Sequence, residues 1–185
     1  MKLLLSYLYA FLTDGALLVG WLLPIYLLAR LLYVTIHQDK TLAKKLRLDH
    51  ELLLLAFFVF LVMLFTQTFV ENSGRNELRL IPFDIIRTQF AEMTQDPDAA
   101  KAFLFNVVGN IGIFVPVGFL AAAIFRRGFW KTAGIGLLIS LCIEIGQLPL
   151  DRTTDVDDLI LNTTGAALGY AVYWICKRLS CRRKK

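Results

Sequence analysis

Residues 144–165 read EIGQLPLDRTTDVDDLILNTTG, and this stretch decides how the rest of the chain is arranged. It places a glutamate, a glutamine, an arginine, four aspartates and an asparagine between two apolar runs. An ionisable side chain inside a bilayer costs about 2.5–3.5 kcal/mol on insertion scales. An otherwise apolar chain is expected to keep such groups for a purpose, so we predict that they form the working site.

The composition is that of an integral membrane protein. Of the 185 residues, 57% are hydrophobic, and the mean hydropathy is +0.59, whereas soluble domains contain about 45–50% apolar residues. We expect a single integral membrane domain over residues 1–185. The net charge of +5 arises from basic residues in short clusters beside apolar runs. That placement is typical of the positive-inside rule, so no nucleic-acid partner is predicted.

The apolar runs predict an all-α fold, a polytopic membrane bundle of about five transmembrane helices, because a spanning helix requires roughly 20 apolar residues. The predicted spans are residues 15–36, 51–70, 102–125, 132–150 and 159–176. Residues 3–12 are too short to cross a bilayer at about 1.5 Å per residue. They are expected to form a short N-terminal helix, either a re-entrant piece or an extension of the first span. Pro24 and Pro116 should bend their helices.

The longest polar connection, residues 71–101, is expected to contain a second short helix. Four of its apolar residues recur at helical spacing: Phe83, Ile86, Phe90 and Met93. This pattern predicts an interfacial helix on the outer membrane surface, with an ordinary loop helix as the alternative. Near the end of the connection, Asp96 followed by Pro97 is typical of a helix N-cap and first helical position.

Basic residues give the expected orientation. Thirteen of the 20 Lys and Arg residues fall in residues 37–50, in the turn at 126–131 and in the tail from residue 177. Five fall in the other two connections, and Arg30, near the end of the first span, is expected to snorkel to the interface. By the positive-inside rule the first three segments are cytoplasmic, which predicts a cytoplasmic C-terminus.

Polar residues on three of the predicted spans lie at similar depth. At 1.5 Å per residue, Asn110, Glu144 and Asn162 lie within about 6–12 Å of the outer ends of their helices. Each has a polar neighbour three or four residues away, on the same helix face. The candidate ligand-binding residues are Asn110, Glu144, Gln147, Arg152, Asp155, Asp158 and Asn162. Three such faces at one depth predict a polar pocket that opens outward.

A structural role is the main alternative for part of this set. Thr154 can cap the last helix, with Asp157 at the third helical position in a capping-box arrangement. Aspartates in a first turn also complement the helix dipole, and Arg152 can pair with one of them. The asparagines can equally serve as hydrogen bonds between helices. Glu144 is harder to explain in this way, because it lies mid-helix, where a carboxylate must be paired or neutral.

Glycines are concentrated on the same three spans. Gly165 and Gly169 form a GxxxG motif, which is typical of a close helix–helix contact in membranes. Four further glycines on the two preceding spans are expected to allow close packing as well: Gly109, Gly112, Gly134 and Gly136.

Several stretches together resemble the VanZ-like family of bacterial membrane proteins, which is named for a teicoplanin-resistance protein. They are residues 80–83 (LIPF), 110–118 (NIGIFVPVG), 144–147 (EIGQ) and 155–158 (DVDD), followed by Asn162 and Gly165. They occur in the family's order and approximate spacing, and the resemblance covers about residues 79–170. It implies a small protein that spans the bacterial cytoplasmic membrane several times, in some cases linked to resistance to glycopeptides. It implies no established catalytic residues.

Our leading hypothesis is that the protein lowers susceptibility to lipophilic glycopeptides by binding an amphiphile in the outer leaflet. The ligand would be the antibiotic itself or a lipid-linked peptidoglycan precursor, and membrane lipid is the other expected partner. Arg152 would contact an anionic group through its planar fork. Glu144, Asn110 and Asn162 would orient the head group within a pocket walled by apolar helices.

Two other functional classes remain open. An intramembrane enzyme could use Glu144 with Asp155 or Asp158 as acid and base, or as metal ligands. Against it, the sequence has no nucleophile with an adjacent base, and both histidines fall on the cytoplasmic side. A transporter is the third hypothesis, although no inverted repeat is visible. No cofactor or metal is assigned, since the three cysteines have no disulfide or metal-binding spacing.

Overall fold

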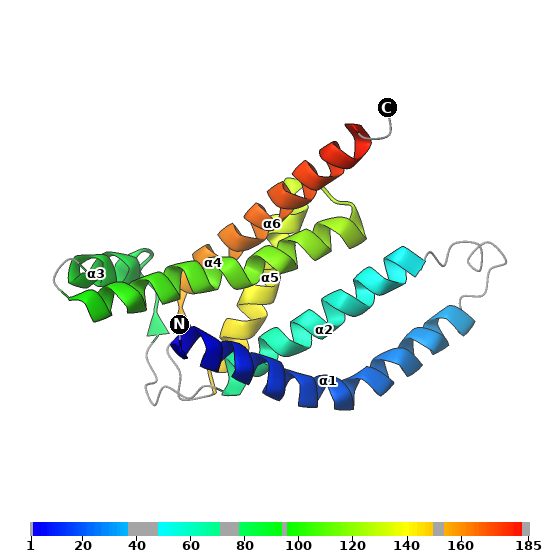
Figure 1. Ribbon diagram of the computed structural model, residues 1–185, viewed down its shortest axis with the longest axis horizontal. Helices are drawn as coiled ribbons and strands as arrows, with labels where there is room; N and C mark the ends of the chain where they lie inside the picture. The colour runs from blue at the N-terminus through cyan, green and yellow to red at the C-terminus, as the bar shows by residue number, and fades with distance from the viewer. Residues whose placement is uncertain (1, 37–47, 71–77, 94–95, 150–153, 183–185) are drawn as a thin grey trace. The chain divides into compact units, whose positions relative to one another are not determined.

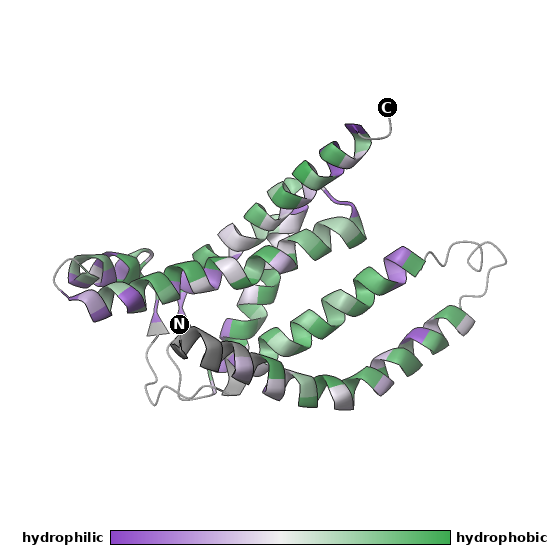
Figure 2. Ribbon diagram, in the orientation of Figure 1, coloured by the Kyte–Doolittle hydropathy of each residue, from purple (hydrophilic) through white to green (hydrophobic). Residues whose placement is uncertain are grey.

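The computed structural model describes residues 2–36, 48–70, 78–93, 96–149 and 154–182, and it confirms the predicted all-α membrane fold (Figure 1). The elements in chain order are α1 Lys2–Ile36, α2 Leu48–Val70, β1 Leu78–Arg79, α3 Asp84–Met93, α4 Pro97–Phe125, α5 Phe129–Gln147, β2 Thr154–Asp155 and α6 Val156–Arg182. All of these helices except α3 are long and apolar enough to cross a membrane. Figure 2 shows apolar residues along most of their length.

The chain divides into two units, Met1–Glu71 and Asn72–Lys185, which are described separately. In the first unit α1 and α2 form an antiparallel hairpin. Three pairs mark their contact along its length: Gly15 with Met63, Tyr26 stacked on Phe58, and Arg30 with Glu51. The last pair is bidentate, with N–O distances of 2.6 and 2.8 Å. Arg30 therefore pairs with a neighbouring helix, and the prediction that it snorkels to the interface stays a prediction.

The first helix is longer than predicted. A separate N-terminal helix was expected at residues 3–12, but α1 runs without interruption from Lys2, so this segment is an extension of the first span. A helix that has already nucleated gains one hydrogen bond per added residue, so an apolar run needs no second start signal. Gly15 lies inside α1, where an added Cβ would come within 2.9 Å of Met63 Cγ. It marks close packing and does not begin the helix.

The start of α4 is as predicted. Asp96 is the N-cap, and its carboxylate accepts a hydrogen bond from the Asp98 N–H at 3.0 Å, with Pro97 at the first helical position. The predicted short helix of the long connection is also present, as α3. The last helix extends beyond its predicted end at residue 176 to Arg182. Its final turns are rich in Lys and Arg, which favour helix and complement the negative end of the helix dipole.

The core of the second unit is the contact between α4 and α6. Gly165 and Gly169 of α6 lie so close to the backbone carbonyls of Ile111 and Val115 on α4 that neither glycine has room for a Cβ. The partners advance together along both helices, so α4 and α6 run parallel. The predicted GxxxG contact is thus confirmed, and its partner surface is the α4 backbone.

The other glycines divide into two groups. Gly136 of α5 lies against the Ala166 side chain, and Gly118 of α4 against the Ala166 backbone, so both belong to the packed core. The expectation of close packing is wrong for Gly109, Gly112 and Gly134, where an added Cβ would meet nothing within 4 Å. Within the part of the second unit that the structure describes, no side chain or backbone of another element comes that close to these three positions, which glycine spacing alone does not reveal.

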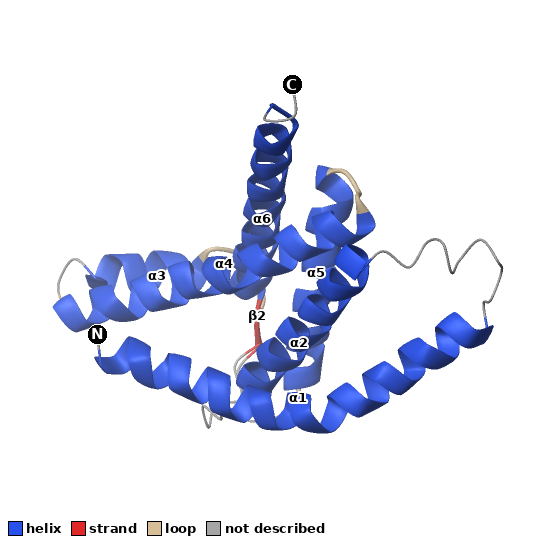
Figure 3. Cartoon of the chain, turned by 45° about the vertical axis from the view of Figure 1, so that its right-hand side comes forward, coloured by secondary structure: helices blue, strands red, loops and turns tan. Residues whose placement is uncertain are grey.

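A pair of two-residue strands was not predicted. In β1 and β2, which run parallel, Leu78 pairs with Thr154 and Arg79 with Asp155. Since β2 leads directly into α6 (Figure 3), this pairing brings the segment before α3 beside the start of α6. The candidate site is built around that junction.

Candidate functional site

The start of α6 is capped by Asp155. Its Oδ1 accepts a hydrogen bond from the Asp157 N–H at 2.9 Å, the usual geometry of an N-cap. The prediction that Thr154 caps this helix is wrong, because α6 begins at Val156 and Asp155, the residue directly before it, occupies the cap position. The Thr154 hydroxyl oxygen is buried and, among the described residues, has no hydrogen-bond partner.

Asp157 reaches out of α6 to the N-terminus of α3. Its carboxylate accepts hydrogen bonds from the backbone N–H groups of Phe83, Ile85 and Ile86, the latter two at 3.1 and 3.2 Å. Phe83 precedes α3 in a left-handed backbone conformation (φ 65°) and has no side-chain acceptor of its own for the free N–H groups. Asp157, only 1% exposed, supplies that acceptor from another helix. The predicted capping-box role for Asp157 is therefore wrong.

A chain of side-chain hydrogen bonds connects α3, α4 and α6. The Asn106 amide donates to Gln89 of α3 at 3.1 Å, and the Asn110 amide donates to Asn106 at 3.1 Å and to Asp158 of α6 at 2.6 Å. Hydrogen bonds to a charged acceptor are among the stronger ones in proteins. The predicted faces of α4 and α6 therefore do meet, and Gln89 joins them as a residue that the sequence did not single out.

A second group lies between α5 and α6. The Asn162 amide donates to the Ser140 hydroxyl at 2.9 Å, and Glu144 Oε2 accepts from the Asp155 N–H at 3.3 Å. All these side chains are buried, with exposures of 0% for Ser140, 4% for Glu144 and 5% for Asn162. The Oδ1 of Asn162 has no hydrogen-bond partner among the described residues. An acceptor buried without a partner carries a desolvation penalty of about 1–3 kcal/mol, so it is a natural contact for a donor on a ligand.

Six of the seven candidate residues lie within the described ranges, on α4, α5, β2 and α6, and Asn110 is in the middle of α4 because this helix begins earlier than predicted, at Pro97. Asn110 with Asp158, and Glu144 with Asp155, are joined directly; Gln147 is buried at the end of α5, one turn beyond Glu144. Arg152 lies outside the described residues. Helical spacing from a candidate residue is one signal for the residues that sequence reasoning missed or misassigned. It applies to Ser140 and Asn106, which are polar and lie four residues before Glu144 and Asn110 on the same helices, but not to Asp157, whose partners lie at the start of α3.

The described carboxylates of the cluster are not grouped as the ligands of a metal ion would be. Within the described ranges no three His, Cys, Asp or Glu side chains are grouped closely enough to hold a metal ion. The carboxylates that were candidate ligands make other contacts: Asp155 caps α6, and Asp158 accepts from Asn110. The arrangement is therefore best described as a hydrogen-bonding cluster, which can recognise hydroxyl, amide or amine groups.

Burial sets the protonation of Asp155, which lies just before the span. Desolvation raises the pKa of its carboxyl above the ordinary range for aspartate, and the nearby Asp157 and Asp84 carboxylates act in the same direction. The hydrogen bond from the Asp157 N–H and the charge of Arg79, its partner in the strand pair, act in the opposite direction. Because the folded protein holds this proton more tightly than the unfolded chain, the protonated carboxyl favours folding at low pH. That contribution is lost as the pH rises through the raised pKa.

A matched pair of substitutions separates the cap from the charge. Asp155→Asn keeps an N-capping side chain but removes the buried charge, so at pH 7 we expect it to melt at or above the parental temperature in detergent. Asp155→Ala removes the cap and should cost about 1 kcal/mol. The difference between parent and Asp155→Asn should shrink as the pH is lowered to 4. An Asp155→Asn protein that melts as low as Asp155→Ala at pH 7 would show that the charge itself stabilises the fold.

Comparison with known proteins agrees with the resemblance seen in the sequence. A sequence model of the VanZ/LLP1 family matches residues 50–177, which include α2 through most of α6. Protein VanZ of Enterococcus faecium is 31% identical over 90 residues, a stretch that is 48% of this chain and 56% of that protein. No solved structure matches. Since the family model covers more than half of the chain, and five helices can cross a membrane, the chain is a multi-pass membrane protein that belongs to the VanZ/LLP1 family.

Proposed function

We propose that this protein lowers susceptibility to lipophilic glycopeptide antibiotics of the teicoplanin type by binding an amphiphile at the polar cluster. Teicoplanin carries an acyl chain and acts on lipid-linked wall precursors, so either molecule would present a polar head and an apolar tail. The cluster formed by α4, α5 and the start of α6 matches this division, because buried polar side chains are adjacent to apolar helix surfaces. In such sites the buried apolar surface provides most of the binding, and a few hydrogen bonds to the polar part of the ligand fix its orientation.

The Oδ1 of Asn162, which accepts no hydrogen bond from any described residue, is the observation that carries this proposal. It belongs to a side chain that is 5% exposed and is fixed in place by the hydrogen bond from its own amide to Ser140. A carbonyl oxygen held in this way favours a hydroxyl or amide donor, groups that glycopeptides and sugar-containing wall precursors both carry. Glu144, one turn from Ser140 on α5, would add a charged acceptor to the same ligand.

The remaining candidates divide into contact and positioning roles. We propose that Arg152, which in sequence falls between α5 and β2, contacts an anionic group of the ligand through its planar fork. Asn110, which bonds to Asp158, would act mainly by holding α4 and α6 at the separation that the head group requires. Asp155 has a similar positioning role at the start of α6.

This proposal requires the cluster to face outside, with the C-terminus in the cytoplasm. In a variant lacking Cys142, Cys176 and Cys181, single cysteines can be placed at Thr88 on α3 and Arg127 between α4 and α5, both exposed. A membrane-impermeant maleimide should label the Thr88→Cys protein in intact cells. It should label the Arg127→Cys protein only after the cells are permeabilised. The reverse pattern would place the cluster on the cytoplasmic side and exclude an outer-leaflet ligand.

Resistance itself is tested by expression in a sensitive host. Cells making the protein should require a higher inhibitory concentration of teicoplanin than cells with an empty vector. A glycopeptide without an acyl chain should show little or no change, because it lacks the apolar part. Equal protection against both drugs would contradict binding of an amphiphilic drug. A chemically altered precursor in these cells would favour the enzyme hypothesis over binding.

A further inference from the structure

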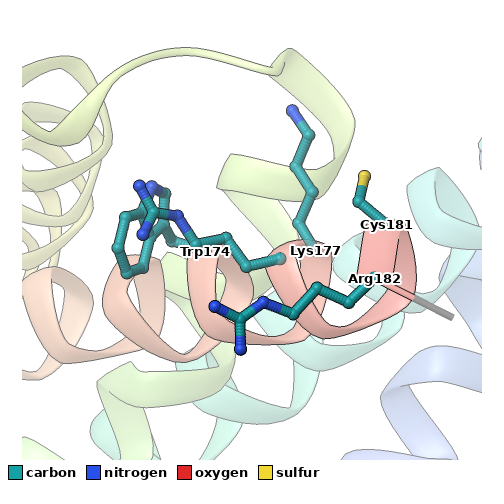
Figure 4. Close-up of a pocket in the computed structure, with 5 residues that line it drawn as sticks. Trp174, Lys177, Cys181 and Arg182 are labelled. Carbon is teal, nitrogen blue, oxygen red and sulfur yellow. The ribbon is translucent and has the colours of Figure 1, made fainter. Parts of the chain in front are cut away.

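The last two turns of α6, at the end opposite the polar cluster, form a second chemically distinct surface. Five residues on one face of the helix line an open hollow of about 380 Å³: Trp174, Lys177, Arg178, Cys181 and Arg182. Their spacing of three and four residues places them on that face. Figure 4 shows the side chains of this basic face projecting from the end of α6. It combines one indole ring, three cations and a thiol.

Two cation–π contacts order the basic face. The Arg178 guanidinium lies 3.8 Å from the centroid of the Trp174 ring, and Lys177 Nζ lies 5.8 Å from the centroid of the Tyr173 ring. A guanidinium stacked on an indole keeps the N–H groups at its edge available for an anion in its own plane. Arg178 is thus held in one orientation before any ligand binds, which reduces the entropy that binding would cost.

No acidic residue of the chain lies near this face in sequence. Asp158 is the last Asp or Glu, so the whole of α6 after its first turn lacks a carboxylate. Among the residues that the structure describes, none of the three cations forms an ion pair. Within the described ranges, these cations are therefore available to an anion from outside the chain.

The residues around the basic face indicate which kind of anion would bind there. Ile175 and Leu179, on adjacent faces of the same turns, are 51% and 56% exposed, as expected of side chains that contact lipid tails. Trp174 is 42% exposed, and tryptophan is enriched where a helix passes from hydrocarbon to head groups. The cations begin just beyond that ring in the chain, where the head-group region is expected if Trp174 lies at the interface.

We propose that the basic face of α6 is a binding site for the phosphate head group of an anionic phospholipid. Arg178, fixed by Trp174, donates two parallel hydrogen bonds to the phosphodiester oxygens, while Lys177 and Arg182 flank it. Basic clusters beside a transmembrane helix attract anionic lipids with about 1 kcal/mol per residue, roughly a fivefold change in affinity. The stacked arginine adds geometric selection to that general attraction. This site is separate from the polar cluster and does not depend on the proposed role in resistance.

Trp174 provides a direct readout of lipid binding. In the full-length chain with Trp21→Phe and Trp130→Phe, Trp174 is the sole tryptophan. In bilayer discs of phosphatidylcholine, lipids with brominated acyl chains quench an indole that they contact. We expect brominated phosphatidylglycerol to quench Trp174 at a mole fraction several times lower than brominated phosphatidylcholine does. Equal mole fractions for both lipids, or displacement of phosphatidylglycerol by millimolar glycerol phosphate, would overturn a lipid site.

Three variants distinguish a built site from diffuse charge. Arg178→Gln should weaken the preference for phosphatidylglycerol roughly fivefold or more, and Arg178→Lys should restore only part of it, because lysine has no planar fork. Arg127→Gln removes one positive charge from the exposed turn between α4 and α5, at the same end of the unit, and should have little effect. If Arg127→Gln weakens the preference as much as Arg178→Gln, or if Arg178→Lys behaves like the parent, the specific site is refuted.

Discussion

Gly165→Ala and Gly169→Ala should each disrupt the second unit, whereas the same change at Gly109 or Gly112 should not. An added Cβ at residue 165 or 169 would overlap the backbone of α4, at the carbonyls of Ile111 and Val115. A side chain can rotate away from such a clash, but a helix backbone cannot, so α4 and α6 would have to separate. Overpacking in an adaptable core lowers the free energy of unfolding by about 1–3 kcal/mol, and we expect a larger loss where the added Cβ clashes with backbone.

The control pair makes this prediction selective. At Gly109 and Gly112 an added Cβ meets no described atom within 4 Å, although both residues lie on α4, the helix that Gly165 and Gly169 contact. Alanine also favours helix over glycine, by about 1 kcal/mol in helix interiors. Thermal melting of detergent-solubilised protein should therefore rank Gly109→Ala and Gly112→Ala at or above the parent, and Gly165→Ala and Gly169→Ala well below it. If all four variants melt alike, helix propensity decides the outcome and the α4–α6 contact does not.

These glycines also show which features of the fold can be read from sequence. The GxxxG spacing on α6 correctly indicated a close contact, and the Asp96–Pro97 pair correctly indicated the start of α4. Both are local signals, in which the physical requirement and the residues that meet it lie within one turn of helix. Apolar run length likewise predicted five spans, because bilayer thickness sets the length of a helix independently of its partners.

The features that sequence reasoning missed depend on partners far apart along the chain. Asp157 serves as the N-terminal acceptor of α3, more than 70 residues earlier, so its own neighbourhood suggested an ordinary capping box. Ser140 looked like an unremarkable small residue until Asn162 was placed against it. The polar faces were predictable because their spacing is helical, but which face meets which depends on the parallel packing of α4 and α6. That packing is a tertiary property.

Glu144→Gln is expected to leave the protein folded and to abolish the proposed protection against teicoplanin. Glu144 is 4% exposed and accepts a hydrogen bond from the backbone N–H of Asp155 at 3.3 Å, so it links α5 to the start of α6. Glutamine has nearly the same shape and retains a carbonyl oxygen that can accept this bond. The structural contribution should survive the substitution, and only the negative charge is lost.

Glu144→Ala is the informative companion, because it leaves the Asp155 N–H without its acceptor and opens space beside α6. An unmet buried donor costs about 1–3 kcal/mol, so this variant should melt lower than Glu144→Gln. Glu92→Gln, the same chemical change at an exposed site on α3, is the control and should behave like the parent in both assays.

The outcomes of the Glu144 substitutions distinguish a role for its negative charge from a purely structural role. Membrane levels and melting temperature report folding, and the inhibitory concentration of teicoplanin in a sensitive host reports function. Normal folding with protection reduced to that of the empty vector assigns the carboxylate to an ion pair with a ligand or to proton transfer. Full protection by a well-folded Glu144→Gln protein would show that an uncharged acceptor is sufficient, so that Glu144 serves only to join α5 to α6. In that case the search for ligand contacts would move to Asn162, whose carbonyl oxygen has no partner in the described ranges and does not depend on the charge of Glu144.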